Sequence, residues 1–187
     1  MSAKMARPTQ KYLRKRLHYD PETGTFTWLS RPVKKRYASH YKIWNARYAG
    51  TSAGHVNKTS NRWIKYLEIK IDYRIYKAHR LAFLYMTGKL PPANMAVDHR
   101  DGDGLNNRWA NIRIATSSQN CGNARIPKNN TSGFKGVSYV KASGRYHAYI
   151  TVNCERINLG FFDTAEEAAR AYKVASQKNF GEFARSC

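Results

Sequence analysis

The clearest pattern of apolar and polar positions lies in the last third of the sequence. Ala148, Ile150 and Val152 alternate with polar side chains, as in a strand that buries one face. A Thr-Ala-Glu-Glu capping box and an alanine-rich stripe then predict one helix over residues 164–179. Three strand-like runs are found at residues 135–140, 146–153 and 156–162. The pattern therefore predicts a unit of three strands and one helix.

The first half of the sequence predicts shorter elements with less regular spacing. Leu67, Ile69 and Ile71 alternate with charged residues, and a turn near Asp72 would let the chain return as the second strand of a hairpin. Further elements are expected as a helix over residues 8–18, a strand over 25–28, the returning strand over 75–78 and a helix over 79–87. Residues 30–62 have no clean period, so loops and small strands are expected there.

The composition is that of a compact, strongly basic protein. Of its 187 residues 42% are hydrophobic, so the chain can form the packed core of one or two domains. Lys and Arg number 33 against 12 Asp and Glu, and the net charge of +21 favours a polyanionic partner, most simply nucleic acid. The sequence has no membrane-spanning run and no signal peptide, so we expect an intracellular protein that is not secreted. The three cysteines form no C-x-x-C pair, which argues against structural zinc and a disulfide framework.

The positive charge is unevenly distributed along the sequence. Residues 1–95 contain 20 basic and 4 acidic side chains, whereas residues 96–126 contain 4 and 3. Acidic residues beside a basic segment repel the phosphates that the segment attracts, unless a divalent cation binds there. Solvated loop carboxylates are the alternative for Asp101 and Asp103. Basic and aromatic residues interleaved over 31–47 suit phosphate contacts, and packing into a core is the alternative for the aromatic rings.

Residues 97–123 contain the candidate chemistry. Asp98 and His99 end a short apolar run, a loop rich in Gly and Asn follows, and residues 111–115 return as a strand before a helix that would hold Asn120. Such a hairpin and helix could bring Asp98, His99 and Asn120 together. Hydrolysis of a phosphodiester needs a cation and a base that activates water, and His99 is suited to be that base near neutral pH. Carboxylate and amide oxygens suit Mg²⁺ or Mn²⁺.

This segment resembles the HNH nucleases, in their phage and intron-encoded homing-endonuclease branch, over roughly residues 10–125. The similarity lies in D-H…N-N-R…N-I-R…T…Q-N and, upstream, in Y-D-P-E-T-G-T-F-T-W and H-R-L-A…G-K-L-P. The resemblance implies a ββα-metal core in which Asp98 and Asn120 bind one divalent ion per active site. It also implies that His99 is the general base and that Asn111 orients the His99 ring.

The activity implied by the resemblance is metal-dependent endonucleolytic hydrolysis of double-stranded DNA. Mg²⁺ or Mn²⁺ is the expected ion, without a further small-molecule cofactor, and Arg100 and Arg113 beside the motif are expected to hold the scissile strand. One active site per chain favours nicking of a single strand, and a monomer is expected because the sequence has no dimerisation heptad. A phage gene and the cytoplasm of a bacterial host are the expected source and location.

The C-terminal unit resembles the ERF-type DNA-binding domain of plant transcription factors, which is also found attached to phage HNH nucleases. The similarity lies in G-F-K-G-V, Y-H-A-Y-I, R-I-N-L-G-F-F-D-T-A-E-E-A-A-R-A-Y and N-F-G. In that family the exposed sheet face lies in the major groove with side chains at base edges. Val140 is one matching position, and the others, which we expect to bind DNA, are Lys135, Ser138, Tyr149, Thr151, Arg156 and Asn158. A sheet that stabilises the nuclease without touching DNA is the alternative.

Together these patterns predict an α+β protein of two modules. An HNH nuclease module is expected over residues 1–125, a linker over 126–133, and an ERF-type domain of a three-stranded antiparallel sheet and one helix over 134–187. Two other functions remain open. One is a sequence-specific DNA-binding regulator with an inactive nuclease module, and the other is a non-specific nuclease that degrades host DNA.

Overall fold

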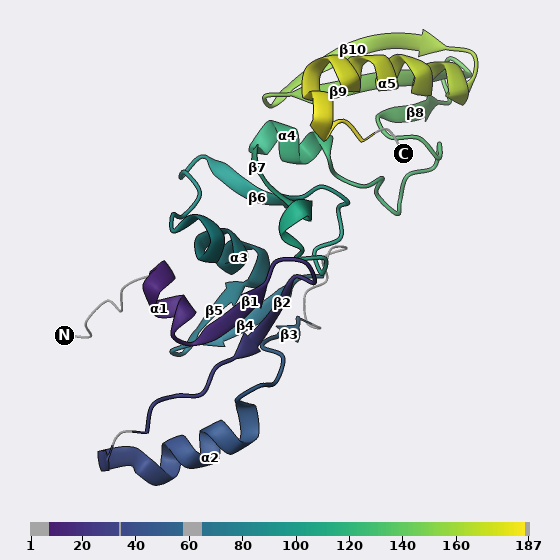
Figure 1. The fold of residues 1–187 in the computed structure, drawn as a ribbon. Coiled ribbons are helices and arrows are strands. Elements are labelled where there is room, and N and C mark those ends of the chain that lie inside the picture. Colours follow the sequence, from purple (N-terminus) through teal and green to yellow (C-terminus); the bar gives the residue numbers. More distant parts are fainter. Residues whose placement is uncertain (1–7, 34, 58–64, 186–187) are drawn as a thin grey trace, which may run out of the picture. The chain divides into compact units, whose positions relative to one another are not determined.

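The computed structural model describes residues 8–33, 35–57 and 65–185, which form a mixture of helices and sheets (Figure 1). The chain divides into two compact units. The first contains Met1–Pro92 and Val97–Arg113, and the second contains Ala93–Ala96 and Ile114–Cys187. The assignment of a nuclease module, a linker and a DNA-binding module to stretches of the sequence remains a prediction about function.

The described part of the first unit contains three α-helices and several short strands. Its elements are α1 (Gln10–Arg14), β1 (Leu17–Asp20), β2 (Thr25–Trp28), η1 (Lys35–Tyr37), α2 (Ala38–Tyr48), β3 (His55–Val56), β4 (Leu67–Ile71), β5 (Arg74–Lys77), α3 (Ala78–Thr87) and η2 (Trp109–Asn111). The division between the units falls within β6 (Met95–His99) and β7 (Ile112–Thr116), which pair with each other. Strands β1 and β2 form one antiparallel pair, and β3, β4 and β5 form a second sheet in that order.

The core of the first unit is built from the apolar positions that the sequence pattern indicated. Leu13, Leu17, Phe26 and Ile69 are fully buried and pack in one cluster with the apolar face of α3. The predicted helix over 8–18 is shorter, because the chain turns after α1 so that Leu17 enters β1. The predicted strand over 25–28 and the helix beginning near residue 79 are confirmed as β2 and α3.

The prediction for residues 30–62 was wrong for its central part, which is the helix α2. The pattern could not indicate this helix, because none of its residues is buried and no apolar stripe runs along it. Residues 58–62 of that range lie outside the described residues. The predicted hairpin turn is confirmed, with Asp72 and Tyr73 both in the left-handed region at φ 46° and 65° between β4 and β5.

The second unit contains a short helix, a three-stranded antiparallel sheet and one long helix. Its elements after β7 are α4 (Ser117–Gly122), β8 (Val137–Val140), β9 (Arg145–Val152), β10 (Glu155–Phe162), α5 (Ala165–Phe180) and η3 (Gly181–Phe183). The strand order is β10-β9-β8, and α5 packs against all three strands. The capping box predicted before α5 is present, because Thr164 Oγ1 accepts from the Glu167 amide and the Glu167 carboxylate accepts from the Thr164 amide. None of the described helices is long and apolar enough to cross a membrane.

Candidate functional site

The strand β6 places Asp98 and His99 side by side at the start of a structured loop. Both residues are buried, with exposed fractions of 7% and 4%. After His99 the chain leaves the strand, and the Arg100 amide donates to the Asn111 carbonyl at 2.9 Å, which closes the loop where β7 begins. The acidic and basic groups of the motif are therefore held on a short, rigid segment.

The Asn111 side chain holds this loop together, and its predicted role in orienting the His99 ring stays a prediction. Its side-chain Nδ2 donates to Asp101 Oδ1 at 2.9 Å and to the Asn106 carbonyl at 2.8 Å. Its Oδ1 accepts from the Asp101 amide at 3.1 Å. The amide of Asn111 is thus fully occupied with the backbone and side chains of the loop. Asp101 and Asp103 are exposed, as expected, yet their carboxylates also accept hydrogen bonds from the loop.

Asn107, which the sequence interpretation did not select, contacts the His99 ring. His99 Nε2 lies 3.3 Å from Asn107 Oδ1, and Asn107 Nδ2 donates to the Leu105 carbonyl at 3.0 Å. Because Oδ1 can only accept, Nε2 carries the proton and Nδ1 is the ring nitrogen that can accept one. The asparagine pair N-N-R in the sequence was the available signal, but it could not show which asparagine faces the histidine.

A close contact with the β1–β2 turn fixes Asn107. The Tyr19 hydroxyl donates to the Asn107 carbonyl at 2.7 Å, and Asn107 is only 2% exposed. Gly24 in that turn has φ 74°, and a Cβ at this position would lie 2.3 Å from the Asn107 carbonyl carbon. Only glycine permits this approach. The Y-D-P-E-T-G segment upstream of the motif therefore supports the loop that orients His99.

A second histidine, His79 at the start of α3, packs against His99. The ring centroids are 4.8 Å apart at 82°, and Tyr66 lies 5.2 Å from the His79 ring. Burial, with the neighbouring His99 as a further cause, lowers the pKa of His79 well below its usual value. Burial also lowers the pKa of His99. The hydrogen bond with Asn107 and the negative charges of the nearby carboxylates raise this pKa and so oppose the shift in part. His99 is therefore neutral at pH 7, the form that a general base requires.

Asp98 forms a buried ion pair with Arg113, which had been expected to hold the scissile strand. Arg113 Nε donates to Asp98 Oδ2 at 3.0 Å, and the two side chains are 6% and 8% exposed. This pair indicates that Arg113 compensates the charge of Asp98 and orients its carboxylate, and the predicted contact of Arg113 with DNA stays a prediction. Arg100 is exposed, as a phosphate contact requires, and its role stays a prediction.

Asn120 lies on α4, which belongs to the second unit. The Thr116 hydroxyl caps this helix in a capping box with Gln119, and Asn120 is exposed. Gly122 packs on the Phe180 ring so closely that a Cβ would lie 2.6 Å from it. The Ser118 hydroxyl accepts from the Asn153 amide at 2.9 Å. Residues of the sheet and of α5 thus position α4 within its own unit.

Lys135 also fixes α4, which differs from its predicted role in DNA binding. Its ammonium group donates to three carbonyls at the C-terminal end of α4, those of Cys121, Gly122 and Ala124, at 3.3, 2.6 and 2.7 Å. A cation at a helix C-terminus satisfies carbonyls that have no partner within the helix. Burial, with Arg185 as a further cause, lowers the pKa of Lys135 to about 8. Lys135 therefore stabilises the C-terminal end of α4 within the second unit.

The other predicted DNA-binding residues share the face of the sheet opposite α5. Ala148 and Ile150 of β9 are buried on the α5 side, so the residues between them point to the other face. The strand register then places five predicted residues on that outer face, namely Ser138, Tyr149, Thr151, Arg156 and Asn158. The Arg156 guanidinium lies over the Tyr149 ring, 3.9 Å from its centroid.

Two further residues lie on this outer face, His147 and Phe161, and the sequence interpretation did not select them. The His147 ring stacks on Phe161 at a centroid distance of 4.7 Å, and its Nε2 lies 3.0 Å from Asn158 Oδ1. Asn158 Oδ1 also accepts from the Gly160 amide at 2.9 Å. Phe161 reaches this face because the register of β10 shifts between Asn158 and Gly160. The period-two pattern places Phe161 on the opposite face, so it could not indicate this residue.

The proposed metal ligands fit a hard divalent cation by their chemistry. Asp98 provides a carboxylate and Asn120 an amide oxygen, the donor types that Mg²⁺ and Mn²⁺ prefer. Within the described ranges, no group of three or more His, Cys, Asp or Glu side chains is arranged to hold a metal ion. The pairing of Asp98 and Asn120 at one ion stays a prediction.

Comparison with known proteins identifies the motif independently of its geometry. The profile of the HNH endonuclease family matches residues 76–121, which include β6, the loop and most of α4. "Protein 3.8" of Escherichia phage T7 is 34% identical over 94 residues, which are 50% of this chain and 77% of that protein. An "uncharacterized HNH endonuclease" of Acanthamoeba polyphaga mimivirus is 33% identical over 117 residues, 62% of this chain and 59% of that protein.

A different group of proteins matches a shorter stretch. An AP2-like ethylene-responsive transcription factor of Arabidopsis thaliana is 39% identical over 54 residues, which are 29% of this chain and 11% of that protein. No solved structure matches the chain. The chain thus spans between about a tenth and three quarters of the length of the curated relatives that it matches.

Proposed function

Because the chain belongs to the HNH endonuclease family, we propose that it is a metal-dependent endonuclease that hydrolyses phosphodiester bonds of double-stranded DNA. The observation that supports this most strongly is the pair Asp98–His99, buried at the end of β6, with each side chain held by its own partner. A neutral, oriented histidine beside a charge-compensated carboxylate suits the activation of water near neutral pH. The net charge of +21 supports a polyanionic substrate.

In the proposed reaction His99 accepts a proton from the attacking water at Nδ1. Asn107 holds the ring by accepting from Nε2, so the basic nitrogen keeps a fixed direction. Arg113 orients the Asp98 carboxylate, and Asp98 and Asn120 would hold the ion. When bound, a divalent ion supplies charge stabilisation at the scissile phosphate and the leaving oxygen. The products are expected to have 5′-phosphate and 3′-hydroxyl ends.

We further propose that the outer face of the β8–β10 sheet selects the DNA target, as in ERF-type domains. Two observations support this proposal. Five of the predicted residues lie on the same face of the sheet, and the chain is similar to AP2-like transcription factors over 54 residues. The resemblance to the homing-endonuclease branch suggests a homing-type enzyme, expected to act as a phage-encoded monomer in a bacterial host and to nick one strand. The regulator and the non-specific nuclease are the outcomes to be tested against it.

Removal of divalent ions should abolish cleavage of a supercoiled plasmid. With Mg²⁺ or Mn²⁺ we expect nicked circles, and with EDTA none, because the scissile phosphate then has no counter-charge. Gel electrophoresis of a time course measures the amount of nicked circles under each of these conditions. Tight binding to one site without cleavage in either ion would instead favour the DNA-binding regulator.

Substitution of Arg156 by Ala should reduce selection of the target while nicking continues. On a site that the wild type selects from a random library, loss of one base-reading side chain costs about 1–3 kcal/mol of binding free energy. Arg170→Ala is the matched control, because Arg170 is exposed on α5, on the other side of the sheet. Unchanged selection by Arg156→Ala would argue for a sheet that only stabilises the nuclease.

Point substitutions are preferable here to deletion of residues 127–187. That deletion would remove Lys135 and Phe180, which support α4. A truncated chain would therefore lose cleavage through a displaced Asn120 even if the sheet never touched DNA.

A further inference from the structure

A hollow of about 730 Å³ in the first unit is lined by basic and aromatic side chains that the nuclease site does not use. Its lining comes from the residue before β1, the end of β2, the end of β4 with the β4–β5 turn, and the helix α2. Arg16, Arg31 and Lys70 provide its positive charges, and Trp28 and Trp44 form part of its wall. The exposed α2, labelled in Figure 1, contributes aromatic residues to this wall and no buried residue to a core.

Arg31 is held in this hollow by its backbone and by its guanidinium plane. Its amide donates to Asn45 Oδ1 at 2.8 Å, and Asn45 Nδ2 donates back to its carbonyl at 2.9 Å. The guanidinium carbon lies 3.7 Å from the centroid of the Trp44 ring. Trp28 meets Trp44 edge to face, with centroids 5.7 Å apart at 86°. The aromatic residues thus fix the direction of the arginine, and the covered face of Trp44 is not open to a base.

The charges around Arg31 are poorly compensated. Asp72 is the acidic residue of the lining, and its carboxylate already accepts from the Tyr12 hydroxyl. Arg31 Nε is buried and has no hydrogen-bond partner among the residues that the structure describes. Burial, together with the repulsion from Arg16, lowers the pKa of Arg31. An anion that enters the hollow would lower the electrostatic cost of holding these cations together.

We propose that this hollow binds a backbone phosphate of the DNA substrate away from the cleaved bond, with Arg31 and Arg16 as its main ligands. The inference rests on the proposed function, since it assumes a DNA substrate. A guanidinium is planar and presents its donors in a fork that matches phosphate oxygens, and stacking on Trp44 keeps that fork in place. Such a contact reads no sequence, so it adds affinity at every site alike.

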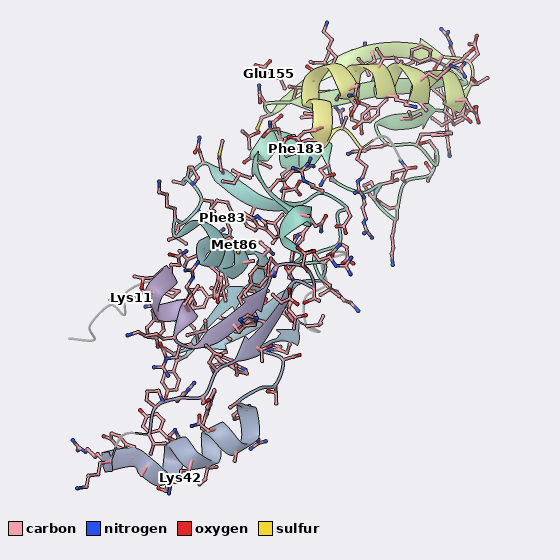
Figure 2. All side chains as sticks on the ribbon, in the orientation of Figure 1. Lys11, Lys42, Phe83, Met86, Glu155 and Phe183 are labelled. Carbon is pink, nitrogen blue, oxygen red and sulfur yellow. The ribbon has the colours of Figure 1, made fainter. Side chains whose placement is uncertain are left out.

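The test measures DNA binding at several salt concentrations in EDTA, so that no cleavage occurs. Loss of one phosphate contact should reduce the slope of log K against log salt by about 0.9 and weaken binding to two unrelated duplexes equally. We expect this of Arg31→Gln and of Arg16→Gln. Lys42→Gln is the control, because Lys42, labelled in Figure 2, is exposed on α2, which contributes to the wall, but does not itself line the hollow. Slopes of both arginine variants equal to that of Lys42→Gln would overturn the proposal.

Two further measurements separate the ways in which the proposal could fail. Circular dichroism shows whether Arg31→Gln folds. If it does not, the salt slope of Arg16→Gln decides the test, because that substitution leaves the stack of Arg31 on Trp44 intact. Wild-type plasmid nicking with Mg²⁺ is assayed in parallel: nicking with unchanged slopes overturns the phosphate site alone, whereas no binding and no nicking overturns the proposed function as well. Tryptophan fluorescence that responds to inorganic phosphate, together with unchanged salt slopes in both arginine variants, would assign the hollow to free phosphate and overturn the DNA contact.

Discussion

His99→Ala should slow the Mg²⁺-dependent nicking of a supercoiled plasmid by about 10²–10⁴-fold, the usual contribution of a positioned general base. The substitution removes the ring that Asn107 orients and that lies next to Asp98. A residual rate is expected, because substrate binding and charge stabilisation remain. Single-turnover rates measured with enzyme in excess report this step without product release.

The pH profile gives the same prediction a second readout. Burial lowers the pKa of His99 below its usual value, so the neutral base predominates above that pKa and is lost as the pH falls through it. The nicking rate of the wild type should therefore fall on the acidic side of pH 6.5, and His99→Ala should lack this acidic limb. His18→Ala, which removes an exposed histidine on β1, should keep both the rate and the profile. An acidic limb that persists in His99→Ala would assign it to another group.

Arg113→Ala should destabilise the protein by about 3–5 kcal/mol, because it leaves the Asp98 carboxylate buried without its charge partner. This is a large part of the total stability of about 5–15 kcal/mol that is usual for a domain. Urea unfolding followed by circular dichroism measures the change. Nicking should also be lost, since the orientation of Asp98 depends on this pair.

The matched control is the ion pair between Arg145 and Asp163 in the second unit. Its geometry is as good, with Arg145 Nε 2.9 Å from Asp163 Oδ1, but the two side chains are 47% and 81% exposed. Arg145→Ala should therefore cost only about 0–1 kcal/mol. Equal destabilisation by the two substitutions would mean that burial does not determine the strength of the Arg113 pair.

The elements that the sequence predicted best are those whose signal is local. The capping box at Thr164 specifies where α5 begins, because the side chain and the amide that it caps are three residues apart. The alternation in β9 likewise gave the buried and outer faces of the sheet. The pair Asp98–His99 could be selected because both residues stand together in one motif.

The contacts that the sequence could not indicate join distant segments. The choice of Asn107 over Asn111 as partner of His99 follows from the β1–β2 turn, more than 80 positions away, which holds the Asn107 backbone. Lys135 resembles a DNA-binding position in its motif, yet three carbonyls at the end of α4 engage its ammonium group. Arg113 was expected at the DNA, and only the fold shows that it faces Asp98. Spacing along the chain contains none of this information.

Imidazole rescue of His99→Ala tests most directly the claim that this chain hydrolyses DNA with the base at position 99. The substitution leaves a buried space next to Asn107 that a free imidazole can fill. We predict slow plasmid nicking without imidazole and a rate that rises with imidazole concentration, whereas the rate of the wild type stays constant. Nicking by His99→Ala at the wild-type rate, with no imidazole added, would contradict the account.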